Sequence, residues 1–121
     1  MKHSIDINRV IDVFRSISKT EEIDERAAVF CHSAKETVER QLKLNCDIAS
    51  NQDRLSYAAG ALAFYRYILS ESANMSASFS AGDLKITSDK NSIEAAKNIY
   101  IQSYNAISDL LFERSFFFRS M

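Results

Sequence analysis

The segment that decides the fold is RLSYAAGALAFYRYIL, residues 54–69, near the middle of the 121-residue chain. Its apolar side chains recur at helical spacing and cover most of the circumference of a helix predicted over about 50–72, with Ser50 or Asn51 as its cap. A helix that is apolar nearly all round belongs at the centre of a domain or inside an assembly. Gly60 costs this helix about 1 kcal/mol relative to alanine, so we expect a neighbouring backbone to approach it closely.

Amphipathic helices are predicted on both sides of this segment, at 5–17, 18–45 and 88–113. Asp6 can cap the first, because its carboxylate can accept hydrogen bonds from the free amides of the first turn. The second is expected to begin at Thr20, where acidic residues follow close behind. The apolar positions of the three helices are Ile7, Val10, Ile11, Phe14 and Ile17; Ile23, Ala27, Phe30, Ala34, Val38 and Leu42; and Ile93, Ala96, Ile99 or Tyr100, Ser103, Ile107, Leu110 and Leu111.

The segment SFSAGDLKITS, residues 78–88, interrupts the helical spacing with strand-like alternation. Phe79, Leu84 and Ile86 fall on one side of an extended ribbon, and Gly82 supplies the residue that tolerates positive φ. We therefore predict a short β-hairpin or extended arm at about 75–88. An isolated hairpin is marginal in water, so this arm is expected to pack on the helices or on another subunit.

Composition favours one helical domain spanning 1–121. The chain has no proline and only two glycines, its hydrophobic content is 46% and its net charge is −1. These values are typical of a globular protein with long helices and short connections, and they give no excess of Lys and Arg for general nucleic-acid binding. No apolar run is long enough to span a bilayer and the first residues do not resemble a signal peptide, so we expect a cytoplasmic protein with reduced thiols.

No pattern in the sequence indicates catalysis, a metal or a cofactor. The two histidines, His3 and His32, have no ligand set at suitable spacing. Cys31 is expected to be a buried small hydrophobe and Cys46 an exposed thiol in a connection. Two glycines cannot make a phosphate-binding loop. A hydrolase or metal enzyme with a site scattered in sequence remains the alternative, and a metal analysis would identify it.

A basic surface is the second alternative. Arg40, Lys43 and Arg54 are predicted to lie around the connection between the second and third helices. They would serve a small helical regulatory or nucleic-acid-binding protein if they faced outward together. Solvated helix faces are the better explanation of these residues, and the aromatic residues fall at core spacing rather than on a stacking platform. Nucleic acid is therefore not the expected partner.

Contact with other proteins is the function that the sequence favours. The third helix is unusually apolar, the ribbon cannot stand alone, and Phe116, Phe117 and Phe118 are consecutive within an aromatic C-terminal tail, 115–121. Exposed apolar surface of this kind marks interfaces. Each feature also has an intramolecular explanation: the helix can be central, the ribbon can close over the core, and the tail can tuck against it.

The order of these parts resembles that of small head–tail connector, or head-completion, proteins of tailed phages and prophages. The similar segments are AAVFCHSAKETVERQL, RLSYAAGALAFYRYIL, SFSAGDLKITS and AAKNIYIQSYNAISDLL, followed by the aromatic end. The resemblance covers the chain from about Glu21 onward.

This resemblance implies a helical structural protein of the virion, without enzymatic activity or cofactor, that forms a ring beneath the portal. The implied partners are further copies of the chain and portal or tail proteins, and the implied location before assembly is the host cytoplasm. The implied inter-subunit residues are Phe79, Gly82, Leu84 and Ile86 of the ribbon, with Phe116, Phe117 and Phe118 meeting a portal or tail partner.

Overall fold

Four α-helices make up most of the chain described by the computed structural model, which covers residues 4–20, 22–77 and 90–111. They are α1 (Ile7–Ser18), α2 (Glu25–Gln41), α3 (Gln52–Ala77) and α4 (Lys90–Ala106), with 3₁₀ turns at Ala49–Asn51 and Ser108–Leu110. The prediction of a mainly α bundle of about four helices is confirmed. The predicted arm at about 75–88 begins too early, because residues 75–77 still belong to α3. The rest of the arm, 78–88, lies outside the described residues, within which the extended pairing is an isolated bridge between Leu42 and Leu111.

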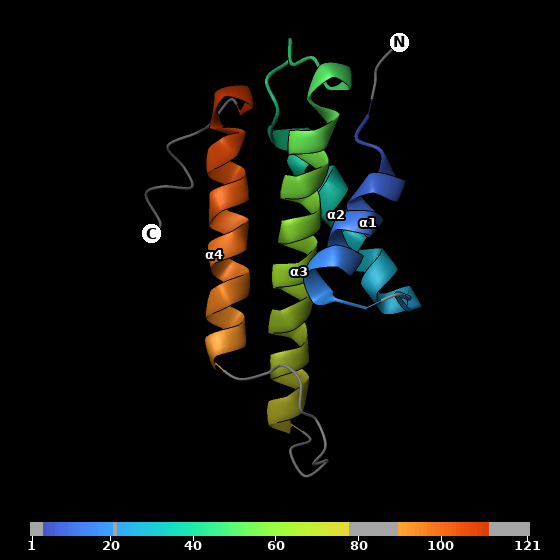
Figure 1. Ribbon diagram of the computed structural model, residues 1–121, viewed down its shortest axis with the longest axis vertical. Helices are drawn as coiled ribbons and strands as arrows, with labels where there is room; N and C mark the ends of the chain where they lie inside the picture. Colours follow the sequence, from blue (N-terminus) through green and yellow to red (C-terminus); the bar gives the residue numbers. More distant parts are fainter. Residues whose placement is uncertain (1–3, 21, 78–89, 112–121) are drawn as a thin grey trace.

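Helix α3 is the centre of the bundle. It contacts α1, α2 and α4, and Figure 1 shows α4 on one side of it and α1 with α2 on the other. The buried side chains of its first half are Leu55, Ser56, Ala58, Ala59, Ala61, Leu62 and Ala63. The central position predicted from the apolar circumference is therefore confirmed. The sequence spacing places Leu55, Ala58, Ala59, Leu62, Tyr65 and Leu69 on one apolar stripe of this helix, and Leu69 departs from it, because 41% of its surface is exposed.

Gly60 marks the closest approach of two helices. A Cβ atom at this position would lie 2.4 Å from Cγ1 of Val13, 2.6 Å from its Cβ and 3.2 Å from the carbonyl oxygen of Val10. All three atoms belong to α1. The expected close approach of a neighbouring backbone is thus confirmed, and it explains why this residue carries no side chain.

The predicted cap of the first helix is confirmed, whereas the predicted start of the second is wrong. Asp6 accepts a hydrogen bond from the amide of Asn8 at 2.9 Å. Helix α1 ends at Lys19, which has a left-handed backbone with φ of 60°. The residues after Lys19 form the turn between α1 and α2, so α2 begins later than predicted. Asp24 caps it in place of Thr20 and accepts a hydrogen bond from the amide of Ala27 at 2.8 Å.

Asp47 organises the start of the third helix. Its carboxylate accepts from the amide of Ser50 at 3.2 Å and from the Ser50 hydroxyl at 2.6 Å. The helix is preceded by the 3₁₀ turn, so neither Ser50 nor Asn51 caps α3 as predicted. Asp47 therefore binds the amide and the hydroxyl of Ser50 within the turn that leads into α3.

The last helix is shorter than predicted. Helix α4 ends at Ala106 and a 3₁₀ turn follows, after which Leu111 is extended and pairs with Leu42. Tyr104, which the predicted stripe omits, is buried and its hydroxyl donates to Oε1 of Gln41 at 3.0 Å. This hydrogen bond ties α4 to the C-terminal turn of α2.

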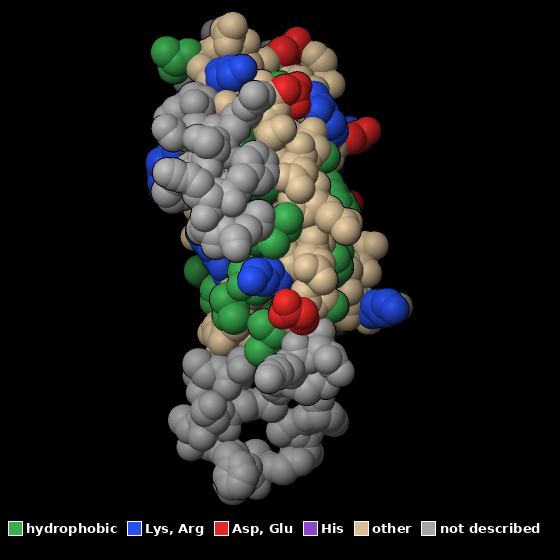
Figure 2. Space-filling model, turned by 90° about the vertical axis from the view of Figure 1, so that its left-hand side faces the viewer, with side chains coloured by type: hydrophobic (Ala, Val, Ile, Leu, Met, Phe, Trp, Pro, Cys, Tyr) green, Lys and Arg blue, Asp and Glu red, His purple; other side chains and the backbone are tan. Residues whose placement is uncertain are grey.

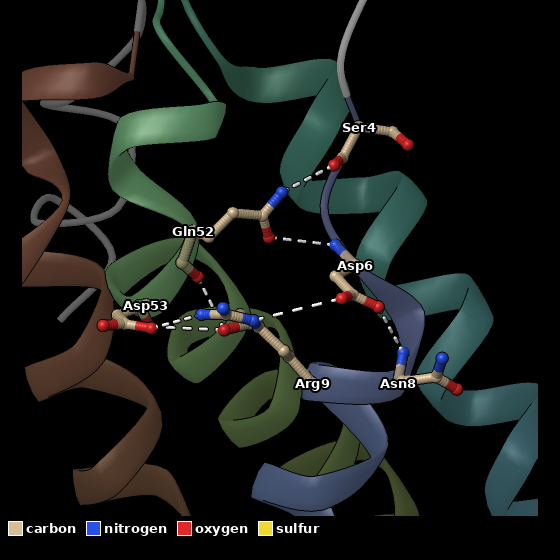
Figure 3. A network of polar contacts seen from close by, with 7 residues as sticks. Ser4, Asp6, Asn8, Arg9, Gln52 and Asp53 are labelled. Carbon is tan, nitrogen blue, oxygen red and sulfur yellow. Dashed lines mark hydrogen bonds and ion pairs between the residues drawn. The ribbon is translucent and has the colours of Figure 1, made fainter.

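A polar network fastens the N-terminal segment to the beginning of α3 (Figure 3). The side-chain amide of Gln52 accepts from the amide of Asp6 at 3.0 Å and donates to the carbonyl of Ser4 at 2.8 Å. Arg9 pairs with Asp53, the next residue of α3. Because the segment is held on both sides of Ile5, this side chain is buried against the helices.

Candidate functional site

The interface residues predicted from the sequence lie outside the described part of the chain. They are Phe79, Gly82, Leu84 and Ile86 of the ribbon and Phe116, Phe117 and Phe118 of the tail. Their role therefore stays a prediction. The described residues instead present a pocket that the sequence analysis did not identify.

The pocket lies where α1 ends and α2 begins, against the middle of α3, and has a volume of about 500 Å³. This volume is in the ordinary range for sites that bind small molecules or side chains. The lining residues are Phe14, Ser18, Thr20, Glu22, Ile23, Asp24, Ala27, Phe64, Tyr67, Ile68 and Glu71. Its floor is apolar and its rim is acidic.

Interlocked aromatic rings form the floor. The ring of Phe14 meets Phe64 at 5.8 Å and Tyr67 at 5.5 Å between centroids, both edge to face. Tyr67 meets Phe30 in the same way at 5.8 Å. Edge-to-face pairs place the positive edge of one ring against the negative face of the next, so each ring limits the orientation of its neighbours. The floor is consequently a preformed apolar surface.

Arg26 fixes one side of this surface. Its guanidinium donates to Glu71 and, at 2.8 Å, to the hydroxyl of Ser70, and it stands 5.3 Å above the ring of Tyr67. The hydrogen bond to Glu71 raises the pKa of Arg26. The pair is partly exposed, so it contributes at most about 1 kcal/mol to stability. Its main effect is to hold the Glu71 carboxylate in place beside the pocket.

The rim is negatively charged. Glu22, Asp24 and Glu71 contribute carboxylates to the lining, which contains no lysine or arginine. Burial, followed by the nearby Glu71 and Asp24 charges, raises the pKa of the Tyr67 phenol, which therefore stays protonated at neutral pH. Negative potential over an apolar floor favours an apolar side chain that carries a positive charge beside it.

The two hydroxyl groups of the lining bond to backbone carbonyls. The Ser18 hydroxyl donates to the carbonyl of Phe14 at 2.8 Å, and the Thr20 hydroxyl donates to that of Glu22 at 3.0 Å. Both hydroxyls are thus engaged with backbone, and the lining contains no histidine or cysteine. Across residues 4–20, 22–77 and 90–111, no group of three or more His, Cys, Asp and Glu side chains is placed to hold a metal ion.

The two thiols lie elsewhere. Cys31 is buried in the core as predicted, and burial raises its pKa to about 11. Cys46 is half-buried and packs against the core, so the prediction of an exposed thiol is wrong. Burial raises its pKa as well. A raised pKa reduces the thiolate fraction, which is the opposite of what a nucleophile needs.

The basic residues around the second connection are engaged with neighbouring groups. Arg54 donates to the carbonyl of Ala106 at 2.8 Å and to Asp109 at 3.2 Å. Arg40 faces Glu36 at 3.8 Å on the same helix. Adjacent acids thus partly neutralise Arg40 and Arg54.

A second apolar area lies on the side of the molecule formed by α4 and the neighbouring part of α3. Figure 2 shows hydrophobic side chains gathered there, next to charged ones. Helix α4 contributes the half-buried Ile93, Ile99 and Tyr100, and Tyr100 stacks on Tyr65 with 5.4 Å between ring centroids.

Comparison with known proteins places the chain in no family: no family model, curated protein or solved structure matches it. In the described part of the chain, the helices lack the combination of length and apolar character needed to cross a membrane.

Proposed function

We propose that the protein is a structural adaptor of the head–tail connector type, which works by contact with other proteins. The observation that carries the proposal is the solvent-open pocket with a rigid aromatic floor and an acidic rim, lined by groups suited to binding. Preformed apolar sites with a polar rim are typical of protein interfaces, where an anchoring side chain fills the pocket. The resemblance in the order of helices, ribbon and aromatic tail adds the virion context.

The apolar circumference of α3 is accounted for by its three neighbouring helices, so it supports no partner. The pocket replaces it as the apolar feature in need of an occupant. The ribbon residues Phe79, Leu84 and Ile86 and the tail residues at 116–118 complete the proposed interaction surface.

In this proposal the chain is made in the host cytoplasm and then joins further copies, a portal protein or a tail protein. A ring requires a heterologous interface, in which two different surfaces of the same molecule meet and the rotation between subunits closes. The molecule acts without catalysis or cofactor.

Sedimentation velocity over a range of about 1–100 µM tests the proposal, since weak interfaces associate in the micromolar range. We expect the sedimentation coefficient to rise with concentration and rings to appear in negative-stain electron microscopy, alone or with a portal protein. Phe79→Ser with Leu84→Ser should weaken association and leave the helical circular dichroism unchanged.

A chain that stays monomeric throughout, and that binds neither a portal nor a tail protein, would refute the proposal. Salt-dependent binding to duplex DNA would favour the nucleic-acid alternative instead.

A further inference from the structure

We infer that the pocket between α1, α2 and α3 receives the C-terminal segment of a second copy of this chain, residues 112–121. This inference rests on the proposed function and deepens it, because it identifies the two surfaces of the heterologous contact. The segment reads FERSFFFRSM, so three adjacent phenylalanines stand between Arg114 and Arg119. Three observations support the assignment: the chemistry of the pocket, its charge, and the place where the described chain ends.

The chemistry of the two surfaces is complementary. Phenylalanine side chains are large apolar groups that gain most when they enter a preformed aromatic site, where edge-to-face contacts add to the area removed from water. The pocket floor supplies such a site through Phe14, Phe64 and Tyr67, whose rings are already fixed against one another. A consecutive trio also allows one ring to enter while its neighbours cover the mouth.

The charges match as well. The pocket lining holds Glu22, Asp24 and Glu71; Glu71 is paired with Arg26, so Glu22 and Asp24 supply the negative charge of the rim. In the segment, Arg114 precedes the trio and Arg119 follows Phe118 directly. An arginine that approaches the rim would meet a carboxylate while the adjacent phenylalanine enters the floor, and this pairing fixes the direction in which the segment lies.

The position of Leu111 favours a second copy over the same chain. Leu111 pairs with Leu42 at the C-terminal end of α2, whereas the pocket includes Asp24 and Ala27 at the N-terminal end. The 17 residues of α2 separate these ends by about 25 Å at 1.5 Å per residue.

A chain gains at most about 3.6 Å per residue when fully extended. Phe116, five residues after Leu111, therefore reaches at most about 18 Å, and Phe118 reaches about 25 Å only along a straight line. Phe116 of the same molecule therefore falls short of the pocket, and Phe118 would need a fully extended chain to reach it. A segment from a neighbouring molecule has no such limit.

The contact that follows is head to tail. Each subunit would offer a pocket at one end of α2 and a segment leaving from the other end, so each molecule donates once and receives once. Such an interface builds a ring when the rotation between neighbouring subunits returns to the first subunit.

A labelled peptide tests the assignment directly. The probe is a synthetic peptide of residues 112–121 with an N-terminal fluorophore, titrated with the full-length variant whose Phe116, Phe117 and Phe118 are replaced by Ser so that its own segment does not compete. We expect saturable binding by fluorescence anisotropy. Glu22→Lys with Ile23→Ser should weaken it at least about tenfold, the loss expected when an anchor contact and a charge pair are removed together. Glu22→Lys alone should weaken it less and preserves the fold, because Glu22 is exposed.

Val29→Ser is the matched control. Val29 is a 63%-exposed apolar side chain of α2 outside the pocket lining, so its loss should leave peptide affinity unchanged. Absence of peptide binding, equal binding by the pocket variants, or preferential binding of a peptide of residues 78–88 would each overturn the inference.

Mixing two full-length variants tests the head-to-tail arrangement. The triple Ser variant lacks the donor and the Glu22→Lys, Ile23→Ser variant lacks the receiver, so each alone should be monomeric by sedimentation velocity over the same concentration range. An equimolar mixture should form dimers and nothing larger, because one intact donor and one intact receiver remain between them. Failure to form dimers would overturn the arrangement.

The results separate the inference from the proposed function. Wild-type rings without peptide binding would refute the inference and leave the function standing. Peptide binding by a chain that never assembles would refute the function and leave the pocket assignment standing.

Discussion

Replacing Gly60 by alanine should destabilise the bundle even though alanine is the better helix former. In an exposed helix the change would stabilise by about 1 kcal/mol. Here the new Cβ would stand 2.4 Å from Cγ1 of Val13, about 1 Å closer than the 3.4 Å at which ordinary contact begins. The contact must therefore be relieved by movement of α1.

Rotation of Val13 does not relieve the clash. Its Cβ is itself 2.6 Å from the added atom, and a β-branched side chain in a helix has essentially one rotamer. The carbonyl oxygen of Val10, at 3.2 Å, belongs to the backbone. Overpacking of this kind costs about 1–3 kcal/mol, and because backbone is involved we take the upper end. After the gain in helix propensity, the net loss is about 2 kcal/mol.

Urea and thermal unfolding followed by far-UV circular dichroism measure this loss. For a chain of this size, about 2 kcal/mol corresponds to a fall in Tm of roughly 6–12 °C. A variant as stable as the wild type, or more stable, would show that α1 does not press against α3 at this residue.

The variant Val13→Ala provides the internal control. It removes Cγ1 and leaves the Cβ contact, so the cost of Gly60→Ala should be smaller in this background by about 1 kcal/mol. An additive double-mutant cycle would contradict the contact.

Three further predictions concern single side chains. Tyr104→Phe should cost about 1 kcal/mol in urea unfolding, since it removes the hydroxyl that donates to Gln41. Arg54→Met should raise the pKa of Asp109, measured by NMR titration, because the Arg54 hydrogen bond is the main cause that lowers it. With the folded pKa below the unfolded value, the stabilisation from Asp109 is present above the unfolded pKa and is lost as pH falls through the folded pKa. Cys31 should resist Ellman's reagent at pH 8 in the folded protein and react after denaturation, because its pKa is about 11.

Controls for these predictions lie in the same chain. Tyr57→Phe, at a 43%-exposed position, should leave stability unchanged, and an equal loss there would remove the case for the buried hydrogen bond. An unchanged Asp109 pKa in Arg54→Met would show that the pair does not form in solution. Cys46 should react in the folded protein before Cys31, because it is only half-buried; the reverse order would contradict the core position of Cys31.

The elements were predictable from the sequence where local signals acted alone. Asp6 is a single acid before an apolar helix, and it caps α1 as expected. Several residues at Thr20–Asp24 have side chains able to cap a helix. Which of them caps α2 depends on the length of the turn that follows Lys19. The end of α4 depends on Leu111 pairing with Leu42, a contact between distant residues. Boundaries set by tertiary contacts leave no local pattern to detect.

The pocket was not predictable for the same reason. Its acids, Glu22 and Asp24, were interpreted as the first turn of a helix, and its aromatic residues have ordinary core spacing. The residues separate into floor and rim only when α1, α2 and α3 are placed together. Ile23, an apolar residue between acids in a connection, was the one local sign that this segment borders an apolar surface.

The order of side-chain sizes along α3 explains both the tight contact and the pocket. Residues 58–63 are small except for Leu62, and there the gap left by Gly60 lets α1 lie directly on α3. The next turn brings Phe64 and Tyr67, whose rings hold the neighbouring helices apart at the end where α1 stops and α2 starts. The small residues of α3 thus let α1 pack closely against it, and the aromatic residues of the following turn leave space for the pocket. The change from small to aromatic residues along α3 therefore accounts for the pocket. Gly60→Ala should disturb the pocket as well as the core, because it displaces α1, the helix that carries Phe14.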